Sequence, residues 1–140
     1  MKAIRVLIVD DVAQVRRELR TLLPLLAAIE VVGEAEHGQR AIELAAALRP
    51  EVIIMDVEMP IVDGLAATRT IKQLCPSCRI VILSIHGEET VRTMARLAGA
   101  DAFVDKGAPL AALLQAIQLD SETTPPSLRG ASFVTKQAPP

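Results

Sequence analysis

Short apolar runs alternate along the chain with segments in which apolar residues recur every three or four positions. The runs are typical of strands buried on both faces of a sheet, and the periodic segments are typical of amphipathic helices. The pattern therefore predicts five strands, each followed by a helix. The predicted strands are Ile4–Val9, Glu30–Glu36, Val52–Met55, Arg79–Leu83 and Ala102–Val104, and the predicted helices are Val12–Leu26, Ala41–Leu48, Leu65–Leu74, Thr90–Ala98 and Leu110–Leu119.

Prolines and a glycine mark several helix ends. Pro24 is expected to end or kink the first helix and Pro50 to stop the second, because a proline ring clashes with the preceding helical turn. Gly99 is expected to cap the fourth helix, since glycine adopts the left-handed conformation found at such ends. The apolar face of that helix is predicted to consist of Val91, Met94, Ala95 and Ala98.

Five strand–helix repeats predict an α/β fold, with a doubly wound parallel sheet covered by helices on both faces. In such folds ligands bind outside the carboxyl ends of the strands. Beyond residue 120 the sequence becomes rich in Pro, Ser and Thr, a composition typical of linkers. We therefore expect one domain at residues 1–120 and a linker-like tail at residues 121–140.

Charged and polar residues lie at the carboxyl ends of four predicted strands. Asp10 and Asp11 follow the first strand, Asp56 follows the third, Ser84 follows the fourth, and Lys106 comes just past the fifth. Because these ends meet at one edge of a parallel sheet, we expect a single pocket there. Three carboxylates close together repel one another, and a bound cation relieves that repulsion. The cluster therefore predicts a Mg²⁺ site.

The same residue types suit phosphoryl transfer. Asp11 and Asp56 can each give Mg²⁺ an oxygen, and Asp10 can hold a metal-bound water. Asp56 is the best candidate nucleophile, since carboxylates form acyl phosphates. Lys106 and Ser84 can contact the phosphoryl oxygens. The alternatives are a helix cap for Asp11, a loop position for Asp56 and a solvated charge for Lys106.

Composition restricts the classes of function. The net charge of −2 and an aromatic content of 1% argue against a nucleic-acid surface. The core must be built from Leu, Ile, Val and Ala. No apolar run is long enough to span a bilayer, and the apolar stretch after Arg5 is too short for a signal peptide. We therefore expect a cytoplasmic protein.

Cys75 and Cys78 form a Cys-x-x-Cys pair. One such pair cannot complete a zinc site, and a thioredoxin-type pair would follow a strand and open a helix, whereas this pair lies between a helix and the next strand. We interpret them as loop cysteines without a special role. Redox sensitivity and an intersubunit disulfide are the alternatives.

With these motifs in view, the chain resembles the receiver domain of bacterial two-component response regulators over about Lys2–Leu119. The resemblance implies a flavodoxin-like sheet with strand order 2-1-3-4-5 and five helices. The matching segments are Val9–Asp11, Met55–Pro60, Asp63–Gly64, Leu83–Ser84, Gly99–Asp101 and Phe103–Lys106.

The resemblance implies a signalling switch that is not an enzyme beyond its own phosphorylation and dephosphorylation. Asp56 would receive a phosphoryl group from a phosphohistidine on a sensor histidine kinase. Mg²⁺ would be bound by Asp11, Asp56 and the backbone carbonyl of Glu58, with Asp10 acting through water. Glu58 and His86 flank the site and are candidates for tuning the lifetime of the phosphoryl group.

Ser84 and Phe103 are implied to form the switch, in which the hydroxyl moves toward the phosphoryl group and the ring rotates inward. Plain core packing is the alternative for Phe103. The chain departs from the family at one point. Many receivers have proline directly after the lysine, whereas here Gly107 follows Lys106 and Pro109 comes three positions on. We therefore predict a trans peptide bond after Lys106.

Two segments, Glu30–Ala35 and Leu83–His86, are most similar to receivers of LuxR-type helix-turn-helix regulators. Such receivers normally continue into a DNA-binding domain, for which the tail here is too short. A stand-alone receiver and the receiver part of a longer transcription regulator are therefore both expected alternatives.

Pro109–Leu119 contains no charged residue, which is typical of a helix buried on more than one side. This helix is expected to meet a partner or a second copy of the chain, and a mild alanine-rich surface is the alternative.

Two other classes of function compete with the receiver. A Mg²⁺-dependent phosphatase of the haloacid-dehalogenase type needs a second acid two positions after the nucleophile in an Asp-x-Asp motif, which neither Asp10 nor Asp56 begins. A binding module that works without phosphorylation has no need of the intact set of acids.

Overall fold

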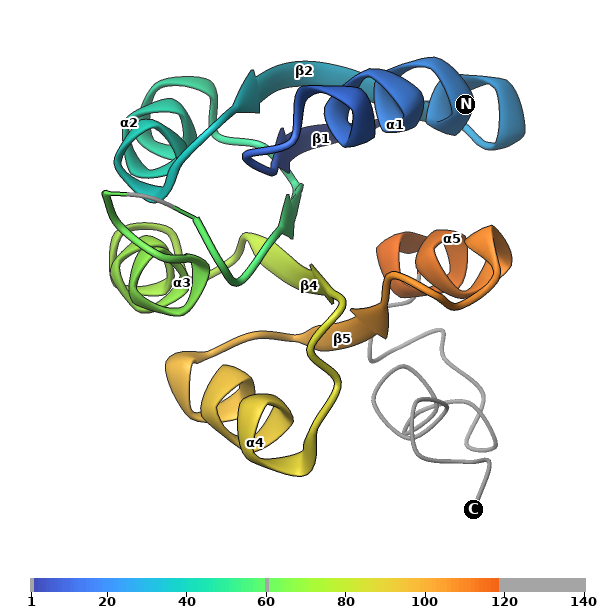
Figure 1. The fold of residues 1–140 in the computed structure, drawn as a ribbon. Coiled ribbons are helices and arrows are strands. Elements are labelled where there is room, and N and C mark those ends of the chain that lie inside the picture. The colour runs from blue at the N-terminus through green and yellow to red at the C-terminus, as the bar shows by residue number, and fades with distance from the viewer. Residues whose placement is uncertain (1, 60, 119–140) are drawn as a thin grey trace.

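Strands and helices alternate along the whole described chain (Figure 1). The computed structural model describes residues 2–59 and 61–118. The elements are β1 (Ile4–Val9), α1 (Ala13–Leu26), β2 (Ile29–Ala35), α2 (Gly38–Leu48), β3 (Val52–Met55), α3 (Gly64–Leu74), β4 (Arg79–Ser84), α4 (Glu89–Ala98), β5 (Ala102–Asp105) and α5 (Leu110–Gln118).

The five strands form one parallel sheet in the order β2-β1-β3-β4-β5, which confirms the predicted fold and strand order. The central pairing sets Val9 of β1 opposite Met55 of β3, so these two strands end at the same level. Their next residues, Asp10 and Asp56, therefore start from the same edge of the sheet.

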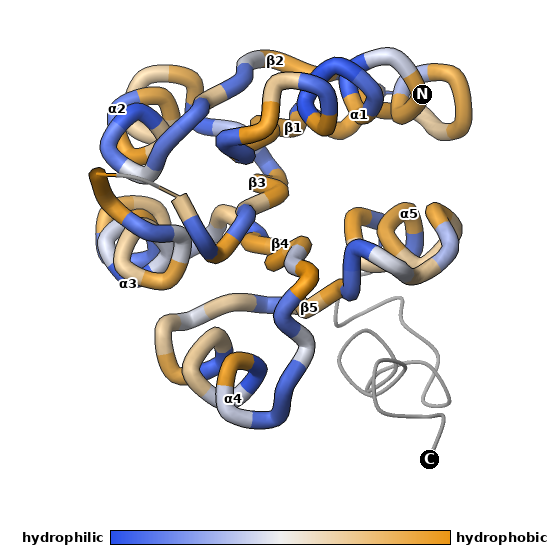
Figure 2. Tube along the Cα trace, in the orientation of Figure 1, coloured by the Kyte–Doolittle hydropathy of each residue, from blue (hydrophilic) through white to orange (hydrophobic). Residues whose placement is uncertain are grey.

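Helices cover both faces of the sheet, with α1 and α5 on one face and α2, α3 and α4 on the other (Figure 1). Two apolar clusters result, one on each side, and the strands contribute alternate residues to each. Figure 2 shows hydrophobic colour concentrated in the strands between the helices. Phe103, fully buried, lies in the cluster under α3 and α4.

Most predicted elements agree with the structure to within one residue at each end. The larger difference is α2, which begins at Gly38 because the His37 Nδ1 accepts a hydrogen bond from Arg40 N at 3.1 Å and caps the helix. Pro24 lies in the last turn of α1, which ends two residues later at Leu26. Predictions for Leu119 and residues 120–140 lie outside the described residues.

Other expectations about the backbone can be compared directly. Gly99 caps α4 with a φ of 108°, as predicted. Asp11 does not cap α1, because the N-cap is Val12 and makes no side-chain capping bond. None of the peptide bonds joining described residues is cis, which confirms the trans bond expected after Lys106. The longest described helix, α1, has 14 residues, too few to cross a bilayer.

Gly64, the first residue of α3, brings that helix against the loop that follows β3. Its N–H donates to Val57 O at 2.7 Å, and a β-carbon on Gly64 would lie 1.7 Å from Asp56 O. Only glycine allows this approach, because the atom in the way belongs to the backbone and cannot move aside. The Asp63-Gly64 motif therefore fixes the main chain around Asp56.

Gly64→Ala is expected to lower the free energy of unfolding by about 2–4 kcal/mol, because the helix and the β3–α3 loop must separate to admit the methyl group. Urea denaturation measures the change. Gly107→Ala is the matched control, since its β-carbon would meet no atom closer than 3.5 Å. Equal stability of the two variants would contradict the close approach.

Candidate functional site

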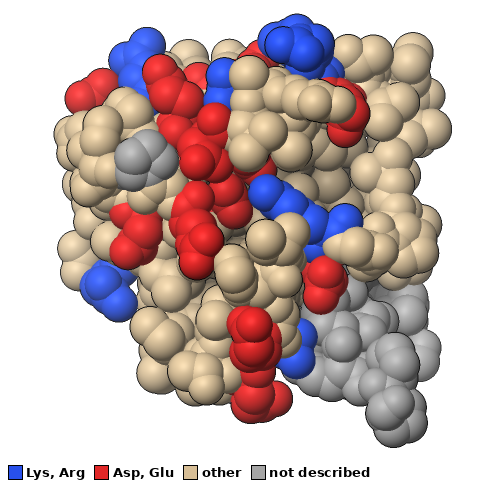
Figure 3. Space-filling view, in the orientation of Figure 1, with Lys and Arg blue, Asp and Glu red and all other residues tan. Residues whose placement is uncertain are grey.

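Three carboxylates meet at the carboxyl edge of the sheet. Each of Asp10, Asp11 and Asp56 offers an oxygen, and these oxygens all lie within 4.8 Å of one another. Main-chain hydrogen bonds hold two of them in place: Asp10 N donates to Ala35 O, and Asp56 N donates to Val9 O, both at 3.0 Å. These bonds continue the sheet past its last residues, so the cluster is held by the sheet itself. Figure 3 shows acidic side chains gathered across this face.

Burial differs among the three acids. Asp10 is 2% and Asp56 is 7% exposed, whereas Asp11 is exposed. Asp10 Oδ1 accepts a hydrogen bond from Val12 N and Asp56 Oδ1 accepts one from Val57 N, both at 2.9 Å. Each buried carboxylate thus retains a second oxygen for another partner.

Lys106 supplies positive charge to the cluster from the end of β5. Its Nζ lies 2.8 Å from Asp10 Oδ2 and 3.6 Å from Asp56 Oδ1. Burial alone lowers the pKa of Lys106, but its hydrogen bond to Asp10 and the charge of Asp56 outweigh burial and raise that pKa above its usual value. The side chain therefore stays an ammonium group.

The pKa of Asp56 is shifted by its position in this cluster. Burial and the neighbouring Asp10 charge raise its pKa to about 6, although Lys106 and the hydrogen bond from Val57 oppose the shift. One ammonium does not neutralise three carboxylates. The donor set therefore fits a hard divalent cation such as Mg²⁺, which prefers oxygen ligands.

Comparison with known proteins identifies the family. The sequence model described as "Response regulator receiver domain" matches residues 6–118. The chain belongs to the response regulator receiver domain family.

Individual relatives agree with this assignment. The response regulator GacA of Pseudomonas viridiflava is 39% identical over 116 residues, which are 83% of this chain and 54% of that protein. The chain thus spans about half the length of the curated relatives that head the comparison.

Solved structures show the same domain. The response regulator domain of Thermotoga maritima CheB is 32% identical with a TM-score of 0.75, and the match covers 85% of this chain and 99% of that one. A LuxR-family response regulator from Aurantimonas sp. SI85-9A1 is 27% identical with a TM-score of 0.80, over 97% of this chain and 99% of that one. The described part of the chain is thus a receiver in two-component signalling.

The two residues expected to form the switch of this receiver lie at adjacent strands. Ser84, 1% exposed, ends β4, and its Oγ accepts a hydrogen bond from His86 N at 2.9 Å. Lys106 N donates to Ser84 O at 2.9 Å, so the serine and the lysine share a fixed main-chain link. Phe103 is fully buried on β5. Phe103 would be buried both as a plain core residue and as a switch residue in its inward position. Its burial therefore does not distinguish these two roles.

Two contacts at the receiver site carry no clear signal in the sequence. Arg16 on α1 donates from Nη1 to Asp10 O at 2.7 Å and pairs through Nε with Glu34 Oε1 at 3.3 Å. Glu58 Oε1 lies 3.1 Å from His86 Nε2, and this contact connects the β3–α3 loop to the β4–α4 loop. The sequence places Glu58 and His86 beside the site, but their contact depends on how the two loops fold.

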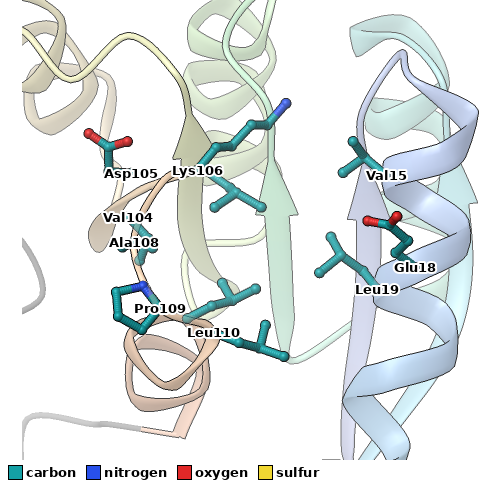
Figure 4. A pocket seen from close by; sticks show the side chains of 11 residues that line it. Val15, Glu18, Leu19, Val104, Asp105, Lys106, Ala108, Pro109 and Leu110 are labelled. Carbon is teal, nitrogen blue, oxygen red and sulfur yellow. The ribbon is translucent and has the colours of Figure 1, made fainter.

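A separate cavity of about 250 Å³ borders Lys106 on its other side. It lies between α1, which contributes Val15, Glu18 and Leu19, and the segment from Ala108 to Leu110 (Figure 4). Its walls are mostly aliphatic, so the cavity does not suit a hard cation and is distinct from the acidic cluster.

The helix α5 carries no large exposed apolar side chain among its described residues. Leu113, Ala116 and Ile117 are buried against the sheet. The large exposed apolar groups lie on other elements, with Leu25 on α1 and Leu97 on α4 the most exposed of them. The exposed residues of α5 are Ala111, Gln115 and Gln118, which are uncharged but not large apolar groups.

The cysteine pair lies far from the acids, at the opposite ends of the strands. Cys78 is 1% exposed, and Cys75 at the end of α3 is half-buried. Burial, with a smaller contribution from Cys75, raises the pKa of the Cys78 thiol to about 12. Its burial does not favour a bond to another subunit.

In the native protein, Cys78 is expected to react with iodoacetamide at least about tenfold more slowly than Cys75, because the reactive form is the thiolate. Mass spectrometry of partly alkylated protein gives the two rates. In urea the rates should become similar. Equal rates in the folded protein would contradict the burial of Cys78.

The raised pKa of Asp56 predicts a pH-dependent stability of the metal-free protein. Because the folded state binds the Asp56 proton more tightly than the unfolded chain does, stability falls as pH rises from about 4 to about 6. Asp56→Asn removes this effect. The free energy of unfolding of Asp56→Asn should be close to that of wild type below pH 4 and exceed it by about 2–3 kcal/mol above pH 7.

Urea denaturation in EDTA at several pH values measures this difference in the free energy of unfolding. Addition of Mg²⁺ at pH 8 is the control, since it should stabilise wild type more than the variant. A difference that does not change with pH would contradict the raised pKa that burial and the Asp10 charge give Asp56.

Proposed function

We propose that Asp56 is the phosphoacceptor of this receiver and takes its phosphoryl group from a phosphohistidine on a sensor histidine kinase in the cytoplasm. The observation that carries the proposal is the contact of Lys106 Nζ with both Asp10 and Asp56 inside a cluster of three carboxylates. Asp56 belongs to this cluster, and its Oδ2 is not used by the hydrogen bond from Val57.

The surrounding residues have separate roles in the proposal. Asp11, Asp56 and the backbone carbonyl of Glu58 would hold Mg²⁺, with Asp10 acting through a water molecule. The ion would supply charge neutralisation for a phosphoryl oxygen. Lys106 would neutralise another oxygen as Asp56 attacks.

Ser84 completes the set. Its hydroxyl would donate to a third phosphoryl oxygen, and Phe103 would respond from the neighbouring strand. A phosphoryl group shifts the equilibrium between two conformations only as far as it contacts one of them better. The Ser84 hydroxyl would be such a contact, and in the present conformation its oxygen accepts a hydrogen bond from His86 N.

The output is a further part of the proposal. The relative named "Transcriptional regulatory protein DegU" supports a role in transcription regulation, in which the receiver would act through a separate DNA-binding domain; a stand-alone receiver is the alternative. A homodimer through the α5 region also remains a proposal. The domain itself would act only on its own phosphoryl group and would not turn over other phosphate esters.

Incubation with Mg²⁺ and acetyl phosphate should add one phosphoryl group to the intact mass. Asp56→Asn should abolish the gain, because the variant lacks the carboxylate oxygen that would form the acyl phosphate. EDTA should also prevent it.

Asp63→Asn is the matched control, since Asp63 belongs to the same loop but caps α3 through Ala66 N, a role that asparagine also fills. This variant should be labelled like wild type. An unlabelled wild type, or an undiminished label on Asp56→Asn, would overturn the proposed function.

A further inference from the structure

Helix α4 turns a charged residue toward the sheet. Arg92 is 7% exposed, although the apolar pattern placed Met94 on this face and Met94 is 49% exposed. The guanidinium carbon of Arg92 lies 5.8 Å from the centroid of the Phe103 ring. Its Nε is buried without a hydrogen-bond partner among the described residues. Arginine is rarely buried without a counter-charge, so the unsatisfied Nε points to a partner that the present conformation does not supply.

Asp105 is a carboxylate well placed to become that partner. A β-carbon on Gly87, in the β4–α4 loop, would lie 2.8 Å from Asp105 Oδ2 and 3.2 Å from Arg92 Nη1. The two charged groups therefore border the same small space, which the missing side chain of Gly87 leaves open. They are not among the ion pairs of the described residues. Asp105 Oδ1 accepts from Gly107 N at 3.0 Å, and this bond leaves Oδ2 available.

The loop between these groups is tied to the phosphoryl site. His86, the residue before Gly87, donates its N–H to Ser84 Oγ at 2.9 Å. Asp105 directly precedes Lys106, which contacts Asp56. A Ser84 hydroxyl that turned to a phosphoryl oxygen would move its oxygen away from His86 N. A shift of Lys106 toward the phosphoryl group would displace the adjacent Asp105 with it.

We propose that phosphorylation of Asp56 brings Arg92 and Asp105 into an ion pair beside Gly87, which makes Arg92 a positioning residue for Phe103. This inference rests on the proposed function. The pair supplies the buried guanidinium with its missing partner and keeps it over the aromatic ring, where a cation is attracted to the ring face. It also joins α4 to the end of β5, so that the position of Phe103 and the position of α4 become coupled.

The test compares the full-length chain with and without beryllofluoride and Mg²⁺, which together mimic the phosphoryl group. Loading should raise the Tm of wild type, because the ligand binds only the folded state. Asp105→Asn and Arg92→Gln should each reduce this rise by roughly 2–6 °C. The double variant should lose no more than either single variant, because both remove the same pair.

Two further variants separate this role from general stability. Asp105→Glu retains the carboxylate and should restore most of the rise. Glu89→Gln removes an exposed charge from the first turn of the same helix and should leave the rise unchanged. Because the readout is the difference between loaded and unloaded protein, a substitution that destabilises both states equally does not alter it.

The outcomes for the two proposals can be distinguished. If wild type gains neither mass from acetyl phosphate nor Tm from beryllofluoride, the proposed function fails and the ion pair with it. If wild type responds and Asp105→Asn shows the same rise, only the ion pair is overturned. Additive losses in the double variant would also overturn it. Asp105→Asn, a half-buried isosteric change, decides the question even where Arg92→Gln does not fold.

Discussion

The site depends on an imbalance of charge that the sheet does not allow to relax. Three carboxylates share one edge with a single ammonium group, and the main-chain bonds of Asp10 and Asp56 to the neighbouring strands prevent the acids from moving apart. Burial and the neighbouring Asp10 charge together raise the pKa of Asp56 to about 6. A site of this kind gains stability from added positive charge, which is why it suits a divalent cation and, with the cation bound, a phosphoryl group.

The same geometry supports our proposal for how a local change in charge would reach the surface. Lys106 contacts Asp56, and its N–H donates a main-chain hydrogen bond to Ser84 O, so a shift of one residue would be passed to the other. Each of these two residues is also connected to a segment farther from the site. Ser84 holds the β4–α4 loop through His86, and Lys106 follows Asp105 at the end of β5. Arg92 and Phe103 are both buried nearby, with the guanidinium carbon 5.8 Å from the ring centroid.

The fold and the acidic cluster are predictable from the sequence because they depend on local pattern and on the rule that parallel strands end at one edge. An apolar run comes before each of Asp10, Asp56 and Lys106. Once these runs pair as parallel strands, the register of the strands leaves little freedom in where the charged residues lie. Contacts between separate loops are different. The bridge from Arg16 to Asp10 O and the pair of Glu58 with His86 depend on the path of chain segments that no periodicity describes. Arg92 shows the limit most clearly, since a helical period assigns a charged residue to the surface and the structure buries it.

The central claim is that Asp56, and neither Asp10 nor Asp11, forms the acyl phosphate. Reduction with borohydride after labelling with acetyl phosphate converts an aspartyl phosphate to homoserine, and peptide mass spectrometry then locates the modified residue. Homoserine is expected at position 56 in the Mg²⁺-treated protein and at no position in the EDTA-treated protein. Homoserine at position 10 or 11, or labelling that does not depend on Mg²⁺, would contradict it.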